Sequence, residues 1–121
     1  MSTNKHAFVI YAGQNETGRV FHALAHAKQA YIRGDSVEVY FAAEGTYWPG
    51  VLAQRDHTMH ALFNEVSQAG AIKGACENCA MAFDHVASAT AACGLVRGPA
   101  ESFGQIDILG LHDAGWRVWL F

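Results

Sequence analysis

The sequence carries little charge and contains no basic run. Only 16% of its 121 residues are charged, and eight basic against eleven acidic side chains give a formal net charge of −3. Nucleic-acid-binding and membrane-surface proteins need a basic patch or stripe, so we expect neither kind of partner. Apolar residues make up 51% of the chain, which favours a packed core over disorder. We therefore expect one folded domain over residues 1–121.

The sequence also lacks long apolar runs and the even number of cysteines that a disulfide framework needs. The apolar run 7–12 is too short for a transmembrane helix, and it lacks the small-residue cleavage site of a signal peptide. We therefore expect a cytoplasmic protein. Three cysteines, an odd number, do not indicate a disulfide framework. In a reducing compartment their interest lies in reactivity or metal binding.

Complete nucleotide-binding motifs are absent as well. Residues 13–18 have the outer glycine spacing of a phosphate-binding loop, but Arg19 and Val20 replace the lysine and the hydroxyl residue that the motif requires. No G-x-G-x-x-G occurs either, so we expect no dinucleotide. Tyr47 and Trp48 could stack on a flavin, but Glu16 is poorly suited to receive its phosphate. We expect no organic cofactor, and we interpret the two aromatic residues as a pocket cover or a subunit contact.

The apolar pattern alternates between strand-like and helical segments. Five short apolar runs predict strands over residues 6–12, 37–43, 72–75, 94–97 and 116–121. Helices are predicted between them: from an N-cap at Thr17 to Gly34, over residues 59–66 to Gly70, over 77–92 with a break near Asp84, and from Pro99 to Gly115. Residues 44–50 are predicted as a loop. Alternating strands and helices predict an α/β fold, namely a flavodoxin-like three-layer sandwich with a five-stranded parallel sheet.

The carboxyl ends of the strands are where such sheets bind ligands. Residues 13–18, 44–50 and 76–79 should meet there, and only the last segment contains a side chain of obvious reactivity. Cys76 directly follows a strand and opens the next helix, where unpaired backbone N–H groups favour a thiolate and lower the thiol pKa. A thiolate suits attack on sulfur or another soft electrophile. The alternative is a small buried apolar cysteine, and position alone does not separate the two.

Two segments of the chain resemble those of a known family. The run Lys73-Gly-Ala-Cys-Glu-Asn-Cys79 is similar to the strand-to-helix signature of the DsrE/DsrF-like family, in which Ala-Cys is followed by a spacer, Asn and usually Ser or Thr. The run 109–116, which leads into a closing strand, resembles that family's last helix and strand. The resemblance implies a DsrE-like fold, a sulfur-relay function with Cys76 as the persulfide-forming residue, and a homotrimer or homohexamer. It also implies donor and acceptor sulfur-carrier proteins as partners.

The candidate site therefore has two reactive residues and three binding residues. Cys76 is the expected catalytic or carrier thiol, and Asn78 of the motif joins Tyr47 and Trp48 as the expected substrate-binding set. Cys79 stands where the family has Ser or Thr, so it is either a replacement for that small residue or a thiol that resolves the Cys76 persulfide and releases sulfide.

Other functions stay open at this point. A non-enzymatic binding or redox-sensing module could use the Cys76/Cys79 dithiol. Cys93 could join both as a metal ligand, although no second C-x-x-C exists and His85 or another residue would have to complete the site. The histidine pairs His22/His26 and His57/His60 have helical spacing but lack a zincin pattern, so we interpret them as solvated or interfacial. We expect no bound metal.

Overall fold

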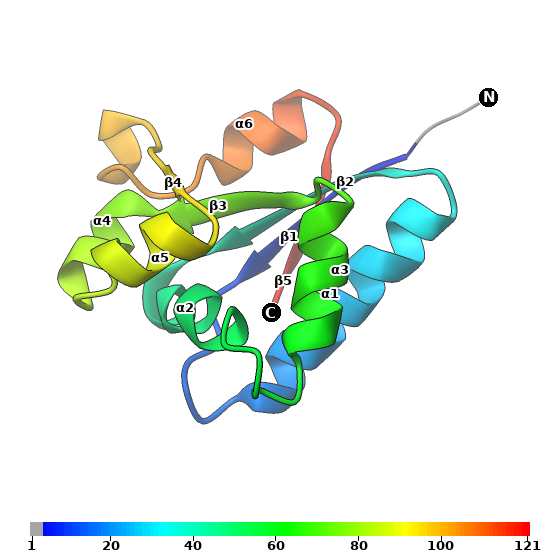
Figure 1. Ribbon diagram of the computed structural model, residues 1–121. Coiled ribbons are helices and arrows are strands. Elements are labelled where there is room, and N and C mark those ends of the chain that lie inside the picture. Colours follow the sequence, from blue (N-terminus) through cyan, green and yellow to red (C-terminus); the bar gives the residue numbers. More distant parts are fainter. Residues whose placement is uncertain (1–3) are drawn as a thin grey trace.

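The computed structural model describes residues 4–121, and its centre is a five-stranded, all-parallel sheet (Figure 1). The strands are β1 (Lys5–Ile10), β2 (Ser36–Phe41), β3 (Ile72–Cys76), β4 (Leu95–Val96) and β5 (Arg117–Leu120). They lie in the order β4-β3-β2-β1-β5, which differs from the 2-1-3-4-5 order of flavodoxin itself. Each strand lies within its predicted run or within one residue of it, so the predicted parallel α/β sheet is confirmed.

Helices cover both faces of this sheet and complete the three-layer sandwich. The helices are α1 (Thr17–Ile32), α2 (Trp48–Leu52), α3 (His60–Gln68), α4 (Glu77–Ala82), α5 (Val86–Ala92) and α6 (Ile108–Asp113). Figure 1 shows α1 and α3 on one side of the sheet and α6 on the other.

Two apolar clusters fill the space between the layers, because successive side chains of a strand point to opposite faces. Phe8 and Ile10 of β1 join the cluster beneath α1, α2, α3 and α5, which we call the first core. Ala7 and Val9 of the same strand join the cluster beneath α6, which we call the second core. Cys76 belongs to the second core.

The helix boundaries agree with the sequence at most points. Gly34 and Gly70 follow α1 and α3 with positive φ, as helix-stopping glycines do. The predicted helix 77–92 is broken at Asp84, which also has a positive φ, into α4 and α5. The N-cap of α1 is Glu16 rather than the predicted Thr17, and no side chain caps that end.

Two predicted segments are wrong in detail. Residues 44–50 are not an open loop, because Ala43–Tyr47 form a short 3-10 helix that continues into α2. The predicted helix from Pro99 to Gly115 is a single 3-10 turn, Ala100–Ser102, separated from α6. The interruption has a backbone cause: Phe103 and Gly104 take left-handed conformations, and the Asp107 carboxylate accepts from the Gly110 N–H to begin α6 afresh.

Candidate functional site

Cys76 lies at the junction that the sequence predicted. It is the last residue of β3 and the N-cap of α4, and its Sγ accepts a hydrogen bond from the backbone N–H of Cys79 at 3.4 Å. A sulfur in this position takes the place of the hydroxyl or carboxylate oxygen that commonly caps a helix. The backbone therefore presents donors to Cys76 before any ligand arrives.

Cys79 lies one helical turn later and shares a partner with Cys76. The Cys79 thiol donates to Oε1 of Gln105 at 3.0 Å, and the Cys76 thiol lies 3.8 Å from the same oxygen. The Cys76 thiol also lies 3.8 Å from the backbone oxygen of Gly104. Both cysteines are buried, with exposed fractions of 0% and 5%, and neither is part of a disulfide. One side-chain amide thus covers a pair of free thiols.

The covering residues belong to a short loop, residues 98–105, which we call the closing loop. Its two ends are joined, because the Gly98 N–H donates to the Gly104 backbone oxygen at 2.9 Å. Asn78 of α4 holds the tip, since its Nδ2 donates to the Phe103 backbone oxygen at 2.6 Å. Asn78 was predicted to bind substrate; in this structure it positions the loop over the thiols.

Burial dominates the ionisation of Cys76. Removal from water raises the pKa of this thiol from 9.0 to about 11, and the Cys79 side chain adds to the rise. The backbone N–H groups of Cys79 and Asn78 act in the opposite direction and lower the pKa, as expected for a helix start. They are the weaker influence, so the expectation of a lowered Cys76 pKa is wrong for the closed protein.

A cleft opens beside the closing loop. It has a volume of about 650 Å³ and lies between this loop and α6, with Tyr11 and Gln105 among its lining residues. Three carboxylates line it as well, namely Glu101, Asp107 and Asp113. Burial raises the pKa of the Tyr11 hydroxyl, and the nearby Cys79 and Cys76 raise it further. The cleft therefore reaches the surroundings of the thiols.

Both aromatic residues predicted to bind substrate pack in or against the first core. Trp48 is 2% exposed, belongs to the first core, and donates its indole N–H to the backbone oxygens of Ala12 and Gly13 at 3.0 and 3.2 Å. It neither covers the thiols nor lies at the surface, so the interpretation of Trp48 as a pocket cover or a subunit contact is wrong. Tyr47 is half-buried and packs edge-on against Trp48 and His85.

The three segments expected at the carboxyl ends of the strands do come together. Glu44 lies against Gly13, and the 3-10 helix Ala43–Tyr47 contacts both β3 and α4. Cys93 does not join them, because it packs against the first core, whereas Cys76 and Cys79 lie in the second. Within residues 4–121 no three His, Cys, Asp or Glu side chains are grouped closely enough to hold a metal ion.

Gln105 and Tyr11 are the site residues that the sequence reasoning missed. Neither belongs to a reactive motif, and both reach the thiols through tertiary packing. One signal was available: the turn-forming pair Gly98-Pro99 and a further glycine at Gly104 lie on either side of a short segment, which argues against a continuous helix there.

Comparison with family models, curated proteins and solved structures finds no match for this chain. Among the helices of residues 4–121, none has the length and apolar character that crossing a membrane would require.

Proposed function

We propose that this chain is an intracellular sulfur-relay protein that carries sulfane sulfur as a persulfide on Cys76. The observation that carries the proposal is the position of Cys76 at a strand-to-helix junction, with a second free thiol one turn later and the Gln105 side chain in contact with both. The resemblance of residues 73–79 to the DsrE/DsrF-like signature supports the same role.

The transfer requires only thiol exchange. The Cys76 thiolate attacks the outer sulfur of a donor persulfide, R–S–SH, which forms Cys76–S–SH and releases R–S⁻. An acceptor thiolate then attacks the outer sulfur of Cys76–S–SH and regenerates the Cys76 thiolate. The backbone N–H of Cys79 already points at Cys76 Sγ and stabilises negative charge there at both stages. No oxidant or organic cofactor enters either step.

The closing loop has to move before this chemistry begins. Cys76 is fully buried, and its raised pKa leaves little thiolate at neutral pH. Gln105 is an exposed residue whose side chain can turn outward, and the contacts it would lose are weak thiol hydrogen bonds. Opening toward the adjacent cleft would bring Cys76 into water and leave the helix-start donors as the main influence on its pKa.

The partners in this proposal are proteins with reactive thiols. The carboxylates Glu101, Asp107 and Asp113 line the cleft and disfavour an anionic donor such as thiosulfate, so a protein-bound persulfide fits better.

We also propose a homotrimer or homohexamer. Large apolar side chains that stay exposed in the single chain support assembly: Phe21, Ile32, Met81, Phe103, Leu109 and Leu120.

A second function is favoured by the shared acceptor. Because Cys76 and Cys79 both reach Gln105 Oε1, the pair is placed to act as a redox-sensing dithiol. Attack of the Cys79 thiolate on the inner sulfur of a Cys76 persulfide would form the Cys76–Cys79 disulfide and expel HS⁻. A cellular dithiol would then have to reduce that disulfide.

Sulfur loading of variants in which one cysteine at a time is replaced by serine separates these functions. After incubation with a persulfidated donor protein, the parent protein and Cys93→Ser should gain the mass of one sulfur atom on Cys76, and Cys76→Ser should gain none. Cys79→Ser should load and hold its persulfide if Cys79 is a resolving thiol, with less sulfide released. Loading that survives Cys76→Ser but disappears in Cys93→Ser would overturn the carrier assignment. A parent protein that loads from no donor yet forms the disulfide reversibly would favour the redox module.

A further inference from the structure

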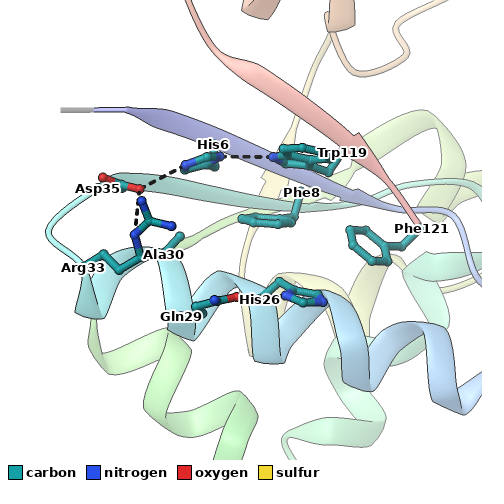
Figure 2. A pocket seen from close by; sticks show the side chains of 9 residues that line it. All are labelled: His6, Phe8, His26, Gln29, Ala30, Arg33, Asp35, Trp119 and Phe121. Carbon is teal, nitrogen blue, oxygen red and sulfur yellow. Dashed lines mark hydrogen bonds and ion pairs between the residues drawn. The ribbon is translucent and has the colours of Figure 1, made fainter. Parts of the chain in front are cut away.

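A second hollow lies beside the first core, on the face of the sheet opposite Cys76 and Cys79. Figure 2 shows the residues that line it. It has a volume of about 320 Å³ and is formed between α1 and the aromatic side chains of β1 and β5. Strand β5 is at the edge of the sheet, while α1 packs over β1 and β2, so the space beside the helix stays open. We call this hollow the ring pocket.

One wall of the ring pocket is a row of aromatic rings. His6 lies 6.3 Å from Trp119 and 6.1 Å from Phe8 between ring centroids, and Phe8 lies 6.1 Å from Phe121. Neighbouring ring planes differ by only 25° to 40°, so the rings lie at shallow angles to one another. Figure 2 shows this row on the sheet side of the pocket, opposite the side chains of α1.

The polar atoms of this wall satisfy one another. The Trp119 indole N–H donates to His6 Nδ1 at 3.1 Å, and because indole nitrogen can only donate, His6 Nδ1 must accept. The proton of the neutral imidazole is then on Nε2, which donates to the Asp35 carboxylate at 3.1 Å. Asp35 is 9% exposed and also pairs with the Arg33 guanidinium at 4.0 Å. The aromatic wall therefore offers ring faces and no free carboxylate.

The opposite wall, on α1, offers hydrogen-bond donors. Gln29 Oε1 is paired with His26 Nδ1 at 3.1 Å, which leaves the Gln29 amide NH₂ as the free end of that side chain. Within residues 4–121 this NH₂ group has no side-chain or backbone partner, and Arg33 pairs with Asp35 through its Nε. The charges of Arg33 and Asp35 offset each other, so the pocket has donors to offer but little net charge.

We propose that the ring pocket binds a planar aromatic molecule of one or two fused rings that carries a hydrogen-bond acceptor on its edge. Its face packs on Trp119 and Phe8, and its acceptor, a carboxylate or carbonyl oxygen, receives hydrogen bonds from Gln29 and Arg33. The volume is at the small end of the range for small-molecule sites, which limits the occupant to this size. Aromatic walls with a few directed polar groups are the usual construction of such sites.

The test uses four naphthalene derivatives with the full-length protein. Naphthoate and naphthamide carry the acceptor edge; aminomethylnaphthalene carries a cationic donor instead; decahydronaphthoate carries the acceptor on a saturated, non-planar frame. Saturable binding, measured by ligand-observed NMR and by calorimetry, is expected for the first two and not for the last two. Equal binding of naphthoate and its saturated analogue would overturn the aromatic part of the proposal.

Variants then locate the site. Trp119→Leu removes the exposed end of the ring row and should weaken naphthoate binding about tenfold, the scale of one lost stacking contact. Trp116→Leu is the matched control, because Trp116 packs against the second core and should leave affinity unchanged. Gln29 lies on the exposed side of α1, so Gln29→Leu removes a donor from the α1 wall without touching the core. Equal losses in both tryptophan variants would refute the location.

A second copy of the chain is the competing occupant. In that case the parent would form oligomers that Trp119→Leu dissociates, as seen by light scattering, and none of the four probes would bind either species. That combination would overturn the proposal of a small-molecule site. The test does not depend on Cys76, so its outcome is independent of the sulfur-relay function.

Discussion

The ionisation of Cys76 is the sharpest test of the site as described. A thiol at a helix start is expected to ionise readily, yet burial under the closing loop raises the pKa of Cys76 from 9.0 to about 11. We predict that the raised pKa prevails while the closing loop covers Cys76. The thiolate should be roughly 100-fold scarcer at neutral pH than for an unperturbed cysteine, which is equivalent to roughly 3 kcal/mol.

The measurement requires Cys76 to be the only thiol. In a Cys79→Ser/Cys93→Ser protein, ultraviolet thiolate absorbance should titrate with a midpoint well above 9.0, because burial, the largest cause of the rise, remains. Alkylation by iodoacetamide at neutral pH should be slower than in the urea-unfolded protein by a factor that approaches 100.

The control is the same protein with the cover removed. Adding Gln105→Ala to this background should bring the midpoint down and speed alkylation, because water can then reach Cys76. If the Cys76 midpoint is at or below 9.0 in the folded Cys79→Ser/Cys93→Ser protein with Gln105 in place, the reasoning is refuted, because the helix-start donors then outweigh burial. An unchanged midpoint after Gln105→Ala would show that this side chain does not cover the thiol.

The remaining predictions concern Cys76, the closing loop and Trp48. The Cys76 thiol is neutral below its unfolded pKa of 9.0, so its contribution to stability is intact there and is lost as pH rises toward 11; urea unfolding should show a steeper decline over that window in the parent than in Cys76→Ser. A Cβ at Gly98 would overlap the backbone carbonyl of Gln105, so Gly98→Ala should displace the closing loop and speed thiol labelling severalfold, whereas Gly18→Ala, with open space around it, should not. Trp48→Phe should lower the free energy of unfolding by about 1–3 kcal/mol, because the buried backbone oxygen of Ala12 and the part-buried one of Gly13 lose their indole donor.

Local sequence determined the elements of this fold and the position of its central thiol. Apolar runs and glycine stops predicted the strands to within a residue or two, because burial on both faces of a parallel sheet demands continuous apolar segments. The step from β3 into α4 was also visible, and it placed Cys76 at the carboxyl end of a strand with backbone donors around it.

Tertiary structure alone decided the environment of that thiol. The residues that cover Cys76 come from a loop about 28 positions along the chain, and no local pattern predicts that Gln105 reaches two thiols. The same is true of Trp48, which packs in the first core, where backbone oxygens 35 and 36 positions away accept its indole N–H. The ring pocket depends on contacts between His6 and Trp119, 113 positions apart. Periodicity and capping act within one element and can be read along the chain, whereas burial and thiol pKa depend on which distant segments pack together.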